Sequence, residues 1–280
     1  MMERRMTDGM LNAFETMLKE DEKSKHTVEK YVRDVRCFWC FAEERGIDKV
    51  LTIEYKAFLE KEYATASANS MIAALNSFLR FAGWEDCCIK QFKVQKKAYC
   101  SENEELTKAE YLSLVRTADD KRNERLSLLI QTICGTGIRV SEVSFITVEA
   151  ARQGEATVYC KGKRRTVFIV SALRKKLLRY AKEHDIRSGM IFVTKSGKAM
   201  NRSNIWREMK ELCKQSGVSP NKVFPHNLRH LFARTFYGIE KDIAKLADIL
   251  GHSNINTTRI YIISTGAEHK HRMESMRLIL

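Results

Sequence analysis

Apolar residues recur with helical spacing along the first part of the chain, from residue 7 to residue 83. The clearest stretch covers residues 67–81, and similar stretches cover residues 11–18, 28–39 and 53–63. On the clearest stretch the apolar side chains share one face, namely Met71, Ile72, Leu75, Phe78 and Leu79. This period of about 3.6 residues is typical of amphipathic helices that bury one face. The pattern predicts an all-helical first domain over residues 1–89.

Charge replaces periodicity after this domain. Residues 90–105 carry four lysines followed by three glutamates, which predicts a linker. The spacing Thr107-x-x-Glu110 then predicts a capping box at the start of a new helix. A second domain over residues 106–263 follows, and residues 264–280 are interpreted as a C-terminal tail.

The second domain contains the clearest strand patterns. Residues 156–160 and 165–170 are rich in β-branched and aromatic side chains and flank a basic turn, Lys161-Gly162-Lys163-Arg164. They predict a β-hairpin. Helical patterns cover the remaining stretches, at residues 125–134, 172–184, 203–215, 226–237, 240–250 and 255–263. The fold class predicted is therefore mainly α with a small β-hairpin, in two domains.

The charge balance of the chain indicates which kind of partner it binds. The chain of 280 residues carries 49 Lys and Arg against 35 Asp and Glu, a net charge of +14. Such an excess favours a polyanionic partner, most often nucleic acid, over a generally basic protein. No signal peptide and no apolar run of membrane-spanning length is present, so we expect a cytoplasmic protein without membrane association. Cys37-x-x-Cys40 could be half of a zinc site, but no second pair at ligand spacing accompanies it, so the two residues are interpreted as reduced core cysteines.

The last third of the chain concentrates polar groups suited to phosphate chemistry. His226, Arg229 and His230 are spaced to share one helical face. Gly251-His252 and Tyr261 follow, although Tyr261 taken alone would be interpreted as a core aromatic. Upstream, Arg139 follows a Gly-Thr-Gly turn at a predicted helix start, where free backbone N–H groups favour a phosphate.

Two other chemistries are disfavoured by specific residues. The His226-x-x-x-His230 spacing suggests zinc, but a zinc protease needs Glu where this chain has Asn227. A nucleotide-binding loop is also disfavoured, because neither Gly162-Lys163 nor Gly197-Lys198 has the required upstream glycine. We therefore expect no metal, no ATP and no other cofactor.

The order and intervals of Arg139, Lys161, His226-x-x-Arg229, Gly251-His252 and Tyr261 resemble the tyrosine recombinase (phage integrase) family. The resemblance covers residues 106–263. It implies a mixed α/β catalytic domain, and the first domain is similar in size and class to the family's SAM-like core-binding domain. Because the chain begins almost directly with that domain, a Xer-like or small mobile-element enzyme is favoured over a large phage integrase.

The resemblance also implies a role for each residue. Tyr261 would attack a DNA phosphate and form a 3′-phosphotyrosyl link, and His226 would accept its proton. Lys161 would protonate the departing 5′ oxygen, with Lys163 as the alternative lysine at the hairpin tip. Arg139, Arg229 and His252 would bind phosphate oxygens. Glu142 and His230 would support these residues.

A site-specific DNA recombinase working through a Holliday junction, without ATP or metal, is therefore predicted. A type IB topoisomerase-like relaxer and a non-catalytic architectural DNA-binding protein are the alternatives. The expected partners are double-stranded DNA with a specific recombination site and further protomers, as a homo-tetramer or a heterotetramer with a paralogue. The tail would dock on a neighbouring protomer or fold back on its own domain. Candidate DNA contacts are Lys25, Lys30, Arg33, Asn69, Ser70, Arg80 and Lys163.

Overall fold

The computed structural model describes residues 4–43, 45–94, 104–160, 163–194, 196–262, 270 and 273–276. The chain forms two compact units, Met1–Lys96 and Lys97–Leu280, and their boundary falls within the predicted linker. Over the described residues the fold is mostly helical with one two-stranded sheet, which confirms the predicted fold class. No helix in this part of the chain is long and apolar enough to cross a membrane.

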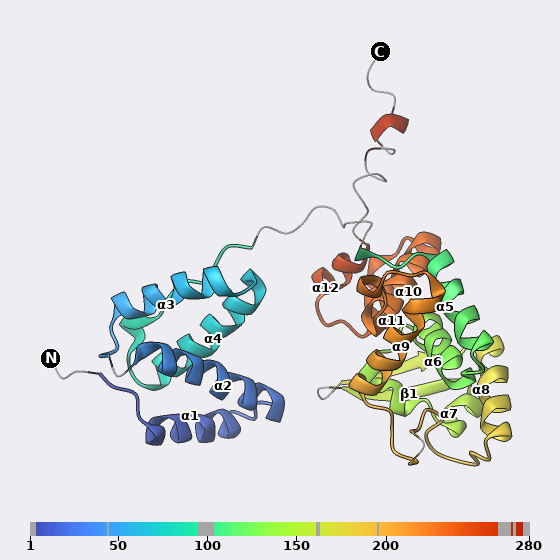
Figure 1. The fold of residues 1–280 in the computed structure, drawn as a ribbon, viewed down its shortest axis with the longest axis horizontal. Coiled ribbons are helices and arrows are strands. Elements are labelled where there is room, and N and C mark those ends of the chain that lie inside the picture. The colour runs from blue at the N-terminus through green and yellow to red at the C-terminus, as the bar shows by residue number, and fades with distance from the viewer. Residues whose placement is uncertain are drawn as a thin grey trace. The chain divides into compact units, whose positions relative to one another are not determined.

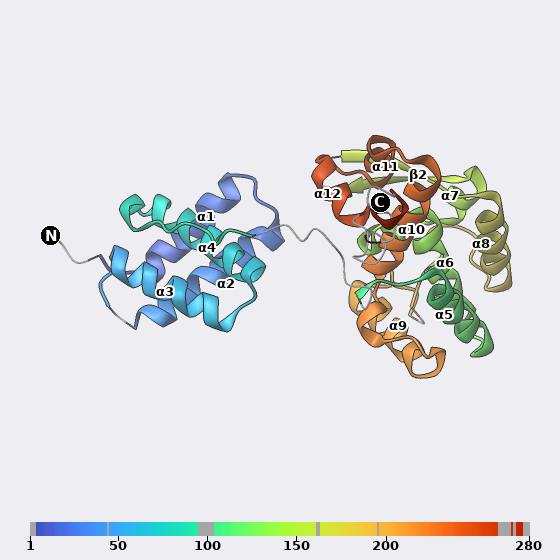
Figure 2. The ribbon, with the colours of Figure 1, turned by 90° about the horizontal axis from the view of Figure 1, so that it is seen from above.

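The described residues of the first unit form a bundle of four α-helices (Figures 1 and 2). Thr7, Ser24 and Asp48 each precede a helix and accept a hydrogen bond from a backbone N–H of its first turn. The predicted apolar faces meet in one core around Phe14, Phe38 and Phe78. The elements are α1 (Asp8–Glu20), α2 (Lys25–Ala42), α3 (Lys49–Glu62), α4 (Thr65–Phe81) and the 3-10 turn η1 (Glu85–Cys87).

The prediction that Cys37 and Cys40 are core cysteines is wrong. Both side chains are exposed on α2, whose buried residues include Val28, Val35 and Phe38. A buried helical face repeats every three to four residues, and positions 37 and 40 lie off the face that these residues define. The six cysteines whose side chains are described are all free thiols.

In the second unit, shown in Figures 1 and 2, α10 contacts α6, α11 and η5. The Thr107–Glu110 capping box is confirmed, with both of its hydrogen bonds present. The elements in chain order are α5 (Lys108–Asp120), α6 (Glu124–Thr136), η3 (Val140–Phe145), α7 (Val148–Gln153), β1 (Glu155–Cys160), β2 (Lys163–Phe168), α8 (Ser171–Glu183), α9 (Arg202–Ser216), η4 (Pro220–Lys222), α10 (Pro225–Glu240), α11 (Ile243–Leu250), α12 (Ile255–Arg259) and η5 (Ile260–Ile262).

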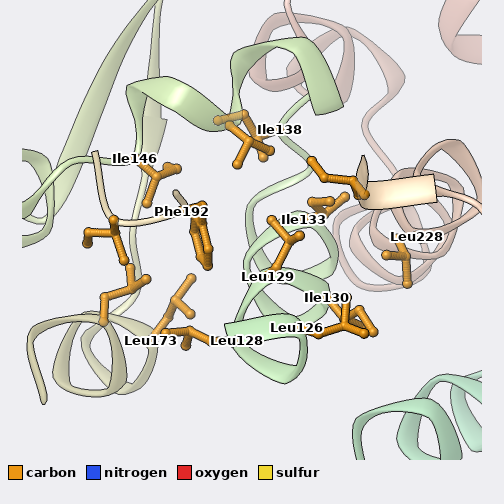
Figure 3. Packing of buried hydrophobic residues seen from close by; sticks show 14 of the residues in the cluster. Leu126, Leu128, Leu129, Ile130, Ile133, Ile138, Ile146, Leu173, Phe192 and Leu228 are labelled. Atoms are coloured by element: carbon orange, nitrogen blue, oxygen red, sulfur yellow. The ribbon is translucent and has the colours of Figure 1, made fainter. Parts of the chain in front are cut away.

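Helix α6 forms the centre of this unit's core. Its residues Leu129 and Ile133 lie between Phe192 and Leu228 in Figure 3. The helix ends at Gly137, whose φ of +64° is unfavourable for other residues. A Cβ at this position would lie 2.5 Å from the ring of Phe232, so both conformation and space require glycine here.

The β-hairpin is tighter than the sequence pattern predicts. Strands β1 and β2 pair antiparallel from Glu155↔Phe168 to Cys160↔Lys163, so β2 begins two residues before the predicted start. Lys163 and Arg164 extend the ladder because their backbones pair with Cys160 and Tyr159. Residues 161 and 162 connect the strands and lie outside the described residues. The hairpin packs against η3 and α11.

Candidate active site

Tyr261 lies on a cavity of about 600 Å³ in the second unit. Four of the predicted site residues line it, Arg139, His226, Arg229 and Tyr261 itself, although they come from three separate parts of the chain. The fold therefore brings together the start of η3, the first turn of α10 and η5. The remaining lining residues are Ile138, Val140, Ser141, Arg202, Trp206, Phe224 and Pro225.

The phenol ring of Tyr261 is 5% exposed and packs against three imidazoles. Its ring centroid is 4.3 Å from that of His230 and 5.3 Å from those of both His226 and His252. It also packs with the apolar residues Ala233, Leu246 and Leu250. The ring is thus fixed by aromatic and apolar contacts beside a polar cavity.

Arg229 is the largest of the fully buried side chains, with 2% exposure. Its Nη1 donates to the carbonyl of Gly137, and its Nη2 donates to the carbonyl of Leu250 at 2.8 Å and contacts Nε2 of His252 at 3.0 Å. Burial, together with the nearby charge of Arg139, lowers the pKa of Arg229 to about 10. The guanidinium therefore remains charged at neutral pH.

Three arginines bind successive carbonyls where α11 ends. The carbonyl of Ile249 accepts from Arg165 at 2.9 Å, that of Leu250 from Arg229, and that of Gly251 from Arg139 at 3.2 Å. The last carbonyls of a helix lack intrahelical partners and carry partial negative charge. The end of α11 therefore holds positive side chains that come from three different elements.

Glu142 lies beneath this arginine cluster and is 2% exposed. One carboxylate oxygen accepts from Nη1 of Arg139 at 3.0 Å; the other accepts from the Arg139 backbone N–H at 3.0 Å and from Nη2 of Arg165 at 2.5 Å. Burial raises the pKa of Glu142, but the hydrogen bond from the Arg139 backbone and the charge of Arg165 outweigh it, so the pKa falls below its usual value. The carboxylate is therefore ionised.

His252 is held between two polar neighbours. Its Nε2 faces Arg229 and its Nδ1 lies 2.9 Å from Oγ1 of Thr258. Because a guanidinium can only donate, Nε2 must accept, and Nδ1 carries the proton that it donates to Thr258. Burial and the charge of Arg229 lower the pKa of His252 to about 4. In this arrangement His252 is neutral. To donate a hydrogen bond to a phosphate from Nε2, that nitrogen would have to gain a proton and release Arg229.

His226 and His230 form one face of α10, as their spacing predicts, with ring centroids 4.9 Å apart. Burial and the charge of Arg229 lower the pKa of His226, which lines the cavity. Burial and the charge of His226 lower the pKa of His230 to about 4. Among the described residues, no group of three or more His, Cys, Asp or Glu is placed to hold a metal ion.

Asn227, the residue that disfavours the zinc interpretation, has a structural role. Its side-chain N–H groups donate to the carbonyls of Glu104 at 2.7 Å and Lys222 at 2.9 Å. These contacts attach the residues before α5 to the start of α10. The position therefore stabilises the helix that carries His226 and Arg229.

Three residues of the site were missed by the sequence interpretation. Arg202 and Trp206 line the cavity from α9, and Arg165 joins the arginine cluster from β2. Arg165 could have been found from its position, because in the predicted strand it shares the alternate positions of Val167 and Ile169 and so lies on their buried face. Of the two hairpin lysines, Lys161 lies outside the described residues, and only the backbone of Lys163 is described.

The candidate DNA contacts of the first unit differ in whether they already pair with other residues of the protein. Nζ of Lys30 and Nη2 of Arg33 pair with Asp34, which is 3% exposed. Both basic side chains line a cavity of about 510 Å³ together with Ser70. Lys25 and Arg80 are exposed, and Lys25 has a long contact of 3.9 Å with Glu29.

Asn69 is engaged within the first unit itself. Its side chain donates to the carbonyl of Phe92 at 3.0 Å and accepts from the Phe92 N–H at 2.7 Å. Both ends of the amide are thus used to fix the segment that follows η1. Contact with a DNA base would require these two hydrogen bonds to break.

Comparison with known proteins identifies the family. The Phage integrase family matches residues 104–268, and the phage integrase N-terminal SAM-like domain matches residues 11–86. Tyrosine recombinase XerA of Pyrococcus horikoshii is 29% identical over 286 residues, covering 98% of this chain and 95% of the relative. Tyrosine recombinase XerH of Campylobacter jejuni is 31% identical over 240 residues, covering 78% of this chain and 67% of the relative.

Solved structures show the same fold. The Tn1549 transposon integrase in complex with a circular intermediate DNA has a TM-score of 0.72 and 18% identity, covering 95% of this chain and 99% of that one. The relatives do not favour the topoisomerase-like or architectural alternatives. The chain belongs to the phage integrase family and is a Xer-like, tyrosine-type site-specific recombinase.

Proposed function

We propose that Tyr261 is the nucleophile of a DNA strand-exchange reaction. Its phenolic oxygen forms a bond to the scissile phosphorus while the bond from phosphorus to the 5′ oxygen breaks. The products are a 3′-phosphotyrosyl link and a free 5′-hydroxyl. The observation that carries this proposal is that Tyr261 shares one cavity with the guanidiniums of Arg139 and Arg229.

The two arginines suit a phosphorane-like transition state, in which negative charge grows on the non-bridging oxygens. Each guanidinium is already oriented by backbone carbonyls, so little reorganisation is needed when a phosphate binds. His226 is the proton acceptor for Tyr261. Its lowered pKa keeps the imidazole neutral at neutral pH, the form that can take a proton.

The departing 5′ oxygen needs a proton, and Lys161 is proposed to supply it from the hairpin. His252 is proposed to donate to the phosphate from Nε2 after that nitrogen gains a proton and separates from Arg229, which keeps its two carbonyl partners. Glu142 and His230 act through other residues: Glu142 orients Arg139, and His230 fixes the ring of Tyr261. The ester conserves the energy of the broken phosphodiester, so a partner strand's 5′-hydroxyl can reseal the backbone without ATP.

Double-stranded DNA with a specific recombination site is the proposed substrate, exchanged through a Holliday junction in the cytoplasm. Residues 1–89 would act as the core-binding domain, residues 90–105 as the linker and residues 106–263 as the catalytic domain. The DNA contacts of the core-binding domain would come from Lys25, Lys30, Arg33, Ser70 and Arg80. The net charge of +14 and the DNA-bound structures of the Tn1549 and XerH proteins support this. Phosphate contacts by so basic a chain would make affinity steeply dependent on salt.

Covalent trapping tests the proposal. Nicked genomic DNA fragments should yield protein–DNA adducts, and sequencing of these adducts should converge on one site. Tyr261→Phe should give no adduct, because the ring is kept and only the nucleophilic oxygen is removed. Tyr159→Phe is the matched control, since Tyr159 is an exposed tyrosine of the same unit. Adducts that persist in Tyr261→Phe would overturn the assignment.

Recombination is proposed to require four protomers on synapsed DNA, either identical or paired with a paralogue. Residues 264–280 would dock on a neighbouring protomer. A chain truncated after Gly266 should still bind and cleave single sites but fail to recombine two sites. Unchanged recombination by the truncated chain would exclude a role for the tail in assembly.

A further inference from the structure

Arg165 is not among the residues that line the catalytic cavity. The cavity is lined by Arg139 and Arg229, whereas Arg165 extends from β2 and bonds to Glu142. Its side chain is 12% exposed, and its stem lies against Gly251: a Cβ at Gly251 would be 2.4 Å from Cδ of Arg165. The absence of a side chain at Gly251 therefore leaves the space that the stem of Arg165 occupies.

The contacts of Arg165 connect three pieces of the site. Nη1 donates to the carbonyl of Ile249, at the end of the helix that leads to His252. Nη2 donates to the same Glu142 oxygen that accepts from the backbone of Arg139. The side chain itself belongs to the hairpin. One guanidinium thus joins β2, the Arg139 turn and the end of α11.

Charge balance gives this link a consequence for phosphate binding. Glu142 is ionised and bonded to Arg139, so on its own it would neutralise much of that guanidinium's charge. Arg165 forms a second ion pair with the same carboxylate. The cluster of Arg139, Arg165, Arg229 and Glu142, three guanidiniums and one carboxylate, then retains net positive charge facing the cavity.

We propose that Arg165 is a positioning residue for strand cleavage: it shares Glu142 with Arg139 and thereby keeps Arg139 oriented and electropositive toward the scissile phosphate. This role rests on the proposed function of Tyr261 and Arg139. It differs from those roles because Arg165 is not among the residues that line the cavity and would act through Glu142 and Arg139.

A neutral phosphate analogue tests the proposal. Suicide duplexes carrying the site recovered by covalent trapping are prepared with either a normal phosphodiester or a methylphosphonate at the scissile position. Arg165→Gln should slow cleavage of the phosphodiester about 10–100-fold, a range typical of residues that orient a group in direct contact with the substrate. On the methylphosphonate, which bears no charge to neutralise, the loss should be much smaller. An equal loss on both substrates, or no loss on the phosphodiester, would overturn the proposal.

Control variants separate the possible causes. Arg164→Gln removes a charge from the neighbouring exposed position of β2 and should keep the wild-type ratio of the two rates. Arg165→Lys should recover only part of the rate, because an ammonium group cannot reproduce the planar fork that reaches Glu142 and Ile249 together. Thermal unfolding shows whether each variant is folded. If Tyr261→Phe still forms adducts, the proposed function fails; if only the Arg165→Gln substrate ratio fails, the positioning role alone is wrong.

Discussion

The two units of the chain use buried polar side chains over very different distances. In the first unit, Asn76 is paired through both ends of its amide with the backbone of Ile89, 13 residues away. In the second unit, Arg229 bonds to the carbonyl of Gly137, 92 residues away, and Arg139 to that of Gly251, 112 residues away. The amide of Asn76 therefore closes a local segment of the first unit, whereas the arginines of the second unit join segments that are distant in the chain.

This difference links stability to function in the second unit only. Burying a guanidinium is costly unless every donor has a suitable partner. The carbonyls at the ends of α6 and α11 supply partners for Nη1 and Nη2 of Arg229, whereas its Nε is buried without a partner among the described residues. The arginines proposed to bind phosphate therefore also hold these helix ends together. A substitution in the arginine cluster should therefore affect both folding and catalysis, while one in the first unit should affect folding of that unit.

Arg229→Met should produce the largest effect. The substitution leaves the carbonyls of Gly137 and Leu250 and Nε2 of His252 without their donor, at about 1–3 kcal/mol for each unpaired buried group. The second unit should lose about 3–5 kcal/mol of unfolding free energy and all detectable cleavage. Urea denaturation with hydrogen exchange of peptides from each unit measures this. Arg116→Met, at an exposed position of α5, should change neither quantity.

Asn76→Leu should have an intermediate effect confined to the first unit. The backbone N–H and carbonyl of Ile89 would lose their partners, which we expect to cost about 2–4 kcal/mol. Hydrogen exchange should accelerate in residues 87–92 and not in α10. Asn12→Leu, at an exposed site of α1, is the control. A loss of protection in both units would show that their stabilities are coupled, and would contradict the claim that this substitution affects the first unit alone.

Acid should destabilise the second unit by less than either of these substitutions destabilises its unit. His230 and His252 have pKa values of about 4, below the value of about 6.5 expected in the unfolded chain. Between these values the unfolded state binds more protons, so stability is complete above pH 6.5 and falls as the pH drops toward 4. The slope is below about 1.4 kcal/mol per pH unit for each ring, because both rings are partly exposed.

Melting of the two units across this pH range measures the effect. His230→Gln should flatten the slope of the second unit, whereas His184→Gln, at an exposed position of the same unit, should leave it unchanged. Equal acid sensitivity of both units would contradict the assignment of the slope to the imidazoles of His230 and His252.

Much of the fold could be predicted because its signals are local. The apolar faces of α1 to α4, the capping box at Thr107 and the hairpin are each encoded within a few turns or strand residues. The exact start of β2 was missed, because polar residues such as Lys163 and Arg164 can extend a ladder through backbone pairing alone. Cys37 and Cys40 were misplaced because neighbouring residues of an amphipathic helix point to different sides.

The sequence by itself determined the family, the helical character of both units and the set of residues proposed for catalysis, since motif order and periodicity are properties of the chain. Only the tertiary structure decided what those residues bind in the folded protein. It showed that Arg229 is buried, that His252 accepts from it, and that Arg165 shares Glu142 with Arg139. Such contacts depend on where α6, α10 and α11 end in space, and long-range packing, not local propensity, sets those positions.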